Sequence, residues 1–385
     1  MMALLALIPV AIWLYLLVGR GMFWTMSERD DIFEGKVGND PAPPAAWPSV
    51  TAVVPARNEA DVIARSVGSL LAQDYPGDFR VVLVDDQSDD GTGDIARALG
   101  GKLTVLAGKP RPAGWTGKIW AMKQGTEAAG TPDYIWFTDA DIDHAPENLR
   151  KLMCRAEAGN LVLTSLMVKL HCRSFSEAYL IPAFVFFFDM LYPFAWVNDP
   201  KNKTAAAAGG CMLARRGALE RAGGVDVIRS EIIDDCAMGR AMKAQGSIWL
   251  GLTNRATSIR PYQGLPEIRR MVARSAYAQL GYSPLNLLGT FIGMIAVYGA
   301  APALAIFAHQ SAQASGILAW LAMGFAFQPI LRFYRVSPLW GIVLPLIGFV
   351  YALFTLDSAI QHWRGKGGMW KGRAQAQVSL KKGQS

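Results

Sequence analysis

The sequence predicts an α/β domain, built on a mainly parallel sheet flanked by helices, between N- and C-terminal transmembrane helices. Three observations support this class. Hydrophobic residues make up 52% of the 385 residues, and the longest apolar runs lie towards the two ends. The middle stretch, about 50–260, mixes charge, glycine and short apolar runs as soluble domains do. Within it, strand-like runs alternate with stretches of helical spacing, which indicates βαβ units.

Short apolar runs in the middle stretch end abruptly at polar residues. The first is followed by helical spacing from Ala60 to Ala72. The runs are 49–54, 80–84, a third that ends at Val105, and 134–137. Because ligands of parallel sheets bind beyond the carboxyl ends of the strands, we expect the functional residues directly after these runs.

The N-terminal run, residues 2–18, has no charge and is followed by Arg20. A cleavable signal would begin with positive charge and end in small residues, and neither feature is clear. Trp13 and Tyr15 are typical of the aromatic belt at a membrane surface. We therefore expect an uncleaved anchor with its N-terminus outside and Arg20 inside.

Three further apolar segments, about 285–307, 314–331 and 338–356, approach the length of a bilayer crossing. Three crossings would leave the basic C-terminal residues outside, against the positive-inside rule. Either a re-entrant last segment, bent at Pro345, or a failed second crossing would return them. The apolar stretch 179–197 is interrupted by Pro182, Asp189 and Pro193, which favours a membrane-surface or re-entrant element there.

The predicted organisation follows from these segments. It comprises an anchor (1–20), a linker (21–48), the α/β domain (49–260), interfacial amphipathic helices (261–283), C-terminal transmembrane segments (284–358) and a basic tail (359–385). The net charge of +7 suits a nucleotide-sugar or an anionic membrane surface. Without zinc-finger spacing or an RNA-binding aromatic signature, no nucleic-acid partner is expected.

The first candidate motif follows the first strand. An arginine and the amides at a helix start suit a diphosphate, and the following Asn and Glu suit ribose or base. The alternative is a plain helix cap. The motif consists of Pro55, Ala56, Arg57, Asn58 and Glu59. Its lack of glycine excludes the dinucleotide-binding fingerprint.

The second motif, after the second strand, contains Asp85, Asp86 and Ser88 among further carboxylates. Crowded carboxylates raise one another's pKa unless a cation or hydrogen-bond donors relieve them. A nucleoside supplies such donors. The alternative is an exposed acidic turn.

The third motif follows the run 134–137 and contains Asp139 and Asp141. Carboxylates at alternate positions beyond a strand suit a hard cation, Mg²⁺ or Mn²⁺, with open sites for diphosphate oxygens. Such a short pattern is also frequent by chance, so its position after a strand carries the prediction.

The fourth motif, Asp234 and Asp235, opens a helical stretch. A carboxylate here could remove the proton of an acceptor hydroxyl, or could only favour the helix N-terminus. Lys118, after a Gly- and Pro-rich loop, suits the donor's phosphates or is simply solvated. Gly209 would let backbone approach an acceptor closely, or form a turn.

The four motifs in this order resemble family 2 glycosyltransferases with a GT-A fold, over roughly Val50 to Leu252. The flanking membrane segments, Gly-Trp-Thr-Gly-Lys and 370–373 further resemble the hopene-associated glycosyltransferases. The resemblance implies that Asp139 faces the nucleotide, that Asp141 binds Mg²⁺ or Mn²⁺, and that Asp235 is the base of an inverting displacement.

The function expected from the residues and the resemblance together is transfer of one sugar from a UDP-sugar to a hopanoid or polyisoprenoid lipid. The enzyme would be a multi-pass protein of the bacterial inner membrane with a cytosolic catalytic domain. A processive glycan synthase is the first alternative, although 267–274 lacks the Gln-x-x-Arg-Trp sequence of processive relatives. A non-catalytic membrane scaffold with a nucleotide-binding fold is the second.

Overall fold

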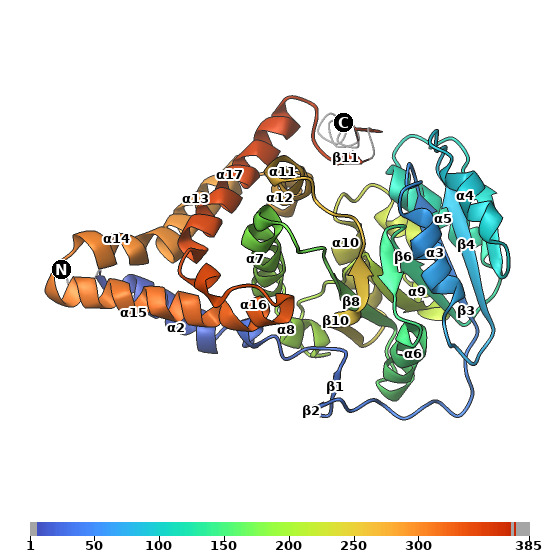
Figure 1. Cartoon of the computed structure of the whole chain (residues 1–385), viewed down its shortest axis with the longest axis horizontal. Coiled ribbons are helices and arrows are strands. Elements are labelled where there is room, and N and C mark those ends of the chain that lie inside the picture. The colour runs from blue at the N-terminus through green and yellow to red at the C-terminus, as the bar shows by residue number, and fades with distance from the viewer. Residues whose placement is uncertain (1–5, 371–372, 375–385) are drawn as a thin grey trace. The chain divides into compact units, whose positions relative to one another are not determined.

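The computed structural model describes residues 6–370, 373 and 374. The chain forms two compact units, each built from separate stretches of sequence (Figure 1). The sheet unit contains 28–171, 196–261 and the described residues from 369; the helical unit contains the residues up to Ser27, 172–195 and 262–368. Residues 172–195 therefore fold with the helical unit, although they lie inside the predicted α/β domain.

An eight-stranded mixed sheet organises the sheet unit, in the order β5-β4-β3-β6-β9-β8-β10-β7. β3, β4, β5 and β6 pair in parallel, and so do β8 and β10, whereas β9 and β7 run antiparallel to their neighbours. The strands are β3 (Val50–Ala56), β4 (Phe79–Asp85), β5 (Leu103–Ala107), β6 (Tyr134–Thr138), β7 (Ile142–His144), β8 (Leu163–Lys169), β9 (Cys211–Arg215) and β10 (Ile248–Ser258). The predicted mainly parallel α/β sheet is confirmed.

Short amphipathic helices cover this sheet. α3 buries Ile63, Val67 and Leu70 at helical spacing. Gly125 lets α5 lie close to β3, because a Cβ there would come within 2.5 Å of Val53. The helices of the sheet unit are α3 (Ile63–Leu71), α4 (Thr92–Leu99), α5 (Gly117–Ala128), α6 (Asn148–Ala158), α9 (Arg216–Arg221), η2 (Gly224–Ile228) and α10 (Asp234–Lys243).

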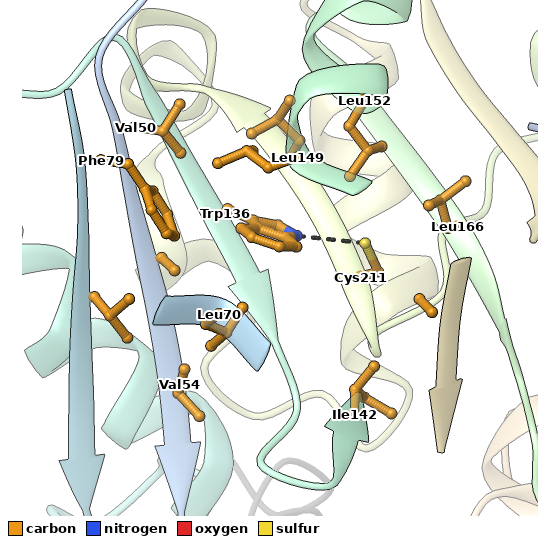
Figure 2. Close-up of a cluster of buried hydrophobic side chains, with 14 of the residues drawn as sticks. Val50, Val54, Leu70, Phe79, Trp136, Ile142, Leu149, Leu152, Leu166 and Cys211 are labelled. Atoms are coloured by element: carbon orange, nitrogen blue, oxygen red, sulfur yellow. Dashed lines mark hydrogen bonds between the residues drawn. The ribbon is translucent and has the colours of Figure 1, made fainter. Parts of the chain in front are cut away.

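Trp136 of β6 lies at the centre of the main hydrophobic core (Figure 2). It is fully buried between Phe79 and Leu149, and its Nε1 donates to the Sγ of Cys211 at 3.3 Å. Because the buried indole N–H has a hydrogen-bond partner, its burial leaves no donor unsatisfied. The core fixes β6 beside β3 and β9, so the strand ends that carry the motifs are held rigidly.

The helical unit carries most of the apolar helices. Its elements are α2 (Ile8–Val18), η1 (Phe23–Thr25), α7 (Phe175–Leu191), α11 (Leu265–Ala273), α12 (Ala276–Gln279), α13 (Pro284–Met294), η3 (Ile295–Gly299), α14 (Ala300–Phe307), α15 (Gln310–Ala326), α16 (Gln328–Tyr334), η4 (Pro338–Gly341) and α17 (Leu344–Trp363). Three helical stretches in the described chain are long and apolar enough to cross a membrane: Pro284–Phe307, Gln310–Tyr334 and Leu344–Trp363.

Two predicted membrane elements take a different form. α2 has 11 residues, fewer than the roughly 17 that a crossing needs, so the N-terminal crossing stays a prediction. α7 continues through Pro182 and Asp189 and ends before Pro193. Ser174 and Glu177 form a capping box at its start, and the buried carboxylate of Asp189 accepts the amide of Phe194 near its end.

The remaining elements are short. α8 (Phe194–Asn198) lies where the chain passes from the helical to the sheet unit. The two-stranded sheets are β1 (Ile32–Phe33) with β2 (Lys36–Val37), inside the predicted linker, and β11 (Met369–Trp370) with β12 (Arg373–Ala374). Most of the predicted basic tail lies outside the described residues.

Candidate functional site

The loops after β3 and β4 are joined by hydrogen bonds from backbone amides of the first loop to side chains of the second. The distances are 2.8–3.0 Å. The bonds run from Asn58 to Ser88, from Glu59 to Thr92 and from Ala60 to Asp90. These amides precede α3, which begins at Ile63, and the second loop satisfies them. Binding of a diphosphate by the first motif stays a prediction.

Arg57 also points into the second loop. Its guanidinium donates to the carbonyl oxygens of Asp86 and Gln87, and its Nη1 lies 4.0 Å from the Asp86 carboxylate. Asp86 is fully buried. Arg57 thus neutralises Asp86 and fixes the loop, while Pro55 and Ala56 are the last two residues of β3.

The acidic loop after β4 supplies donors to its own carboxylates. Asp85 accepts the amide of Ser88 at 3.0 Å, and Asp90 accepts both the amide and the hydroxyl of Thr92 at the start of α4. These bonds to the charged form lower the pKa of Asp90 although burial acts against them. Part of the crowding that suggested a bound nucleoside is therefore relieved locally.

A cation that the sequence did not single out joins the first and third motifs. Arg260, two residues after β10, forms an ion pair with Glu59, and its Nε lies 3.5 Å from the Asp141 carboxylate. The amide of Ile259 donates to the Asp141 carbonyl at 2.9 Å. The end of β10 is thereby fixed beside Asp141. The sequence showed Arg260 only as one of several basic residues near the apolar segments.

Lys118 joins the third and fourth motifs. Its Nζ lies 2.9 Å from Asp139 and 3.0 Å from Asp234, with only 18% of the side chain exposed. Burial alone would lower the pKa of Lys118, but the neighbouring carboxylates outweigh it and raise the pKa well above its usual value. The solvated-lysine alternative is therefore wrong: this ammonium is an internal counter-ion.

Asp235 has a raised pKa. Its Oδ2 accepts the amide of Gly209 at 3.1 Å, and its Oδ1 accepts the amide of Cys236 at 2.7 Å. Burial and the neighbouring Asp234 raise the pKa of Asp235 to about 6, whereas Lys118 and the two amides act in the opposite direction. Of the two predicted acids, Asp234 is paired with Lys118, whereas Asp235 is held by two amides and has a raised pKa. Its role as a base stays a prediction.

Asp143 and His144, which follow Asp141, both have structural partners. Asp143 pairs with Arg65 at 2.5 Å. His144 is buried between the Thr138 hydroxyl, at 2.8 Å, and the Asn148 amide, at 3.1 Å, and burial lowers its pKa to about 3. A neutral imidazole therefore holds the loop that presents Asp139 and Asp141.

The four motifs thus form one connected set of charges. Arg260 links Glu59 to Asp141, and Lys118 links Asp139 to Asp234. Within residues 6–370, 373 and 374, no group of three or more His, Cys, Asp or Glu side chains is arranged to hold a metal ion. Mg²⁺ and Mn²⁺ at such sites take one or two carboxylates and complete their shell with phosphate and water oxygens. Asp139 and Asp141 fit that requirement.

Comparison with known proteins finds a family for part of the chain. Residues 51–223 match the model of glycosyl transferase family 2, and they include the first three motifs with Lys118 and Gly209. Over these residues the chain is similar to family 2 glycosyl transferases. The narrower resemblance to hopene-associated glycosyltransferases stays a prediction.

The curated relatives match the transferase domain over part of their length. The succinoglycan biosynthesis protein ExoO of Rhizobium meliloti is 36% identical over 152 residues, 36% of this chain and 42% of that protein. The 4,4'-diaponeurosporenoate glycosyltransferase of Staphylococcus haemolyticus is 29% identical over 118 residues, 30% of this chain and 31% of that protein. The chain thus spans less than half the length of these relatives.

A solved structure shares the fold around the transferase domain. The mannosyltransferase PcManGT of Pyrobaculum calidifontis, in complex with GDP-Man and Mn²⁺, has a TM-score of 0.54 at 19% identity. The similarity covers 97% of this chain and all of that one. At this identity the similarity establishes the GT-A fold.

Proposed function

We propose that this chain is a membrane-bound inverting glycosyltransferase that moves one sugar from a nucleotide donor, a UDP-sugar, to a lipid acceptor of hopanoid or polyisoprenoid type. The observation that carries the proposal is Asp235, whose carboxyl group has a pKa of about 6 and is held by the Gly209 amide. Lys118 connects it, through Asp234, to the proposed donor residue Asp139.

The proposed donor site comprises the ends of β3, β4 and β6. Glu59, Asp86 and Asp139 would accept hydrogen bonds from the nucleoside, and Lys118 would meet the diphosphate. Asp141, with Asp139, would hold Mg²⁺ or Mn²⁺. When bound, that ion supplies Lewis-acid stabilisation of the negative charge on the departing nucleoside diphosphate.

In the proposed transfer, the oxygen of the acceptor hydroxyl forms a bond to the anomeric carbon of the sugar. Asp235 takes the hydroxyl proton, and the bond between the anomeric carbon and the diphosphate oxygen breaks. The leaving nucleoside diphosphate keeps the electron pair, and because the hydroxyl attacks from the opposite face, the anomeric configuration inverts. The Gly209 and Cys236 amides orient the carboxylate, and each oxygen keeps a lone pair for the proton.

A lipid acceptor is favoured by the three apolar helical stretches of the helical unit. The relative named as a diaponeurosporenoate glycosyltransferase also carries an apolar acceptor in its name. Location in a bacterial inner membrane with a cytosolic catalytic domain belongs to the same proposal. An acceptor held in the bilayer would meet the base by diffusion in two dimensions, which favours productive orientation.

The test uses membranes that contain the full-length chain, Mn²⁺ and a panel of nucleotide-sugars, followed by mass spectrometry of the lipid extract. We expect one lipid to gain the mass of a single sugar, and Asp235→Asn to reduce this product about 100-fold or more. Asp226→Asn, at a surface carboxylate paired with Lys123, is the matched control and should retain activity. A long polymer would support the processive synthase instead. Full activity of Asp235→Asn, or no transfer or donor hydrolysis with any nucleotide-sugar, would refute the proposal.

A further inference from the structure

In the helical unit, the segment just before the first apolar stretch contacts the end of the last apolar stretch. The amide of Tyr277, in α12, donates to the hydroxyl of Ser358 in α17 at 3.0 Å, and the Tyr282 ring stacks on His362 with centroids 4.4 Å apart. Tyr282 lies two residues before α13, and His362 lies at the end of α17. The entry to the first apolar stretch and the exit from the last therefore lie side by side. A chain that leaves and returns to one side makes an even number of complete crossings, which excludes three.

The first two apolar stretches form an antiparallel hairpin, in which α14 and α15 lie side by side (Figure 1). Gly316 of α15 lies directly on α14, because a Cβ there would be 2.8 Å from the carbonyl of Ala301. Close contact of this kind, made possible by a glycine, is typical of helices packed within membranes. Such a hairpin would take the chain across the membrane and return it to the side from which it started.

The distribution of charged residues along the chain agrees with this hairpin. The sequence has no Lys, Arg, Asp or Glu from 275 to 331, a stretch that includes the turn between α14 and α15. Exposed basic residues occur before the hairpin, after it and after α17. They are Arg270 and Arg274, then Arg332 and Arg335, then Arg364 and Lys366. By the positive-inside rule these three positions share the cytosolic side, and the uncharged turn lies opposite.

The third stretch then has to enter and leave on the cytosolic side. It is preceded by the non-helical and 3₁₀ segment 336–343, whose carbonyl groups need partners if they lie in the apolar layer. Two side chains of the hairpin supply them. Trp320 Nε1 donates to the Ile342 carbonyl at 2.8 Å, and Gln328 Nε2 donates to the Pro338 carbonyl at 3.2 Å.

The start of α17 lies beside the middle of the first stretch rather than beside its far end. A Cβ on Gly348 would be 2.8 Å from the Tyr298 ring, and Tyr298 belongs to η3, between α13 and α14. From this point α17 runs back to α12. This is the pattern of a segment that enters the membrane partway and returns to the same side.

We propose that 284–334 cross the bilayer twice as a helical hairpin and that 336–363 form a re-entrant element supported by Trp320 and Gln328. The outward apolar side chains of Leu288, Ile292 and Leu321, each more than half exposed, would contact lipid tails. Arg364 would meet anionic headgroups of the inner leaflet. This arrangement does not depend on which sugar or acceptor the enzyme uses.

The test labels single introduced cysteines in intact cells with a membrane-impermeant maleimide, and repeats the labelling after permeabilisation. We expect His309→Cys, in the turn of the hairpin, to be labelled from outside. Arg335→Cys and Lys366→Cys should be labelled only after permeabilisation. The unmodified chain is the background control for the natural cysteines, three of which are buried.

The outcomes separate the alternatives. Labelling of Lys366→Cys from outside would mean that the last helix crosses completely, and would overturn the re-entrant element. If His309→Cys were protected in intact cells, the hairpin would not cross. Gln328→Leu removes the donor to the Pro338 carbonyl, and Gln313→Leu, near the turn, is its control. Loss of the folded, membrane-inserted protein in Gln328→Leu would further support the carbonyl contacts. Normal folding and insertion of this variant would count against them.

Discussion

The ammonium of Lys118 should control the pH at which Asp235 becomes a base. Replacement of Lys118 by Met keeps most of the length and apolar body of the side chain but removes its charge. The same charge lowers the pKa of Asp235 in the folded protein. Its loss should therefore raise that pKa above about 6 and move the acidic limb of the activity profile to higher pH.

The size of this shift follows from the geometry around Gly209. An ideal Cβ on Gly209 would lie 3.1 Å from Nζ of Lys118 and 3.6 Å from Oδ2 of Asp235, so the two charged atoms are at most about 6.7 Å apart. At an effective dielectric constant of about 20, unit charges at that separation interact by about 2.5 kcal/mol. This corresponds to about 1.8 pKa units. We expect an observed shift of about one to two units, because water entering the space left by the ammonium screens part of the effect.

The assay is the pH dependence of kcat/KM, which reports the ionisations of the free enzyme. An active base needs the carboxylate, so the wild-type rate should fall as the pH drops through about 6. Lys118→Met should fall at a pH one to two units higher, while Lys118→Arg, which keeps the charge, should stay close to the wild type. Lys123→Met, on the same helix and paired with Glu127 and Asp226, is the matched control.

If kcat/KM of Lys118→Met fell at the same acidic pH as that of the wild type, the reasoning would be refuted. The rate at high pH separates the two roles of Lys118. If the lysine also binds the diphosphate, KM for the donor should rise at every pH, whereas a purely electrostatic role would leave the high-pH value unchanged.

Three other predictions rest on different parts of the sheet unit. Arg260→Gln should raise the affinity of the donor-free protein for Mn²⁺ several-fold in an electron paramagnetic resonance titration, because it removes a cation that competes for Asp141; unchanged affinity would contradict this. His144, neutral when folded down to about pH 3, takes a proton on unfolding below about pH 6.5. Stability should therefore fall by about 2 kcal/mol on acidification to pH 5, and His144→Asn should lack this component in pH-dependent denaturation. Trp136→Ala should lower the free energy of unfolding by about 3–5 kcal/mol, and a loss below about 1 kcal/mol would show that the core collapses around the gap.

The strands that lead to the motifs were predictable because their sequence signal is local. β3, β4 and β6 are short apolar runs that end at polar residues, and the observed bounds agree with the predicted ones to within one or two residues. β10 was not predicted, because its second half, from Thr253 onward, is polar and lies partly exposed. β9 and β8 also escaped notice. Their pairing with the parallel half depends on contacts between distant parts of the chain.

The roles of the predicted site residues stay predictions, and their pairing could not be read from the sequence. Glu59 and Arg260 are 201 positions apart and meet only because β10 continues the sheet past β8 and pairs with β7. Nothing in the linear pattern distinguishes Arg260 from neighbouring basic residues. By contrast, Asp235 was predicted from its position at a helix start, and the structure adds the amide of Gly209 that orients it.

The ion pairs of Lys118 and Arg260 impose a condition on donor binding. The carboxylates of Glu59, Asp139 and Asp141 would repel one another strongly without these two cations. A diphosphate brings further negative charge to the same strand ends, so it would bind poorly unless positive charge came with it. A divalent ion that arrives with the diphosphate offsets that charge and leaves Lys118 and Arg260 able to turn from the carboxylates to the phosphate oxygens. The same two side chains that pair with these carboxylates in the donor-free fold would then recognise the proposed donor, so metal and nucleotide are expected to bind cooperatively.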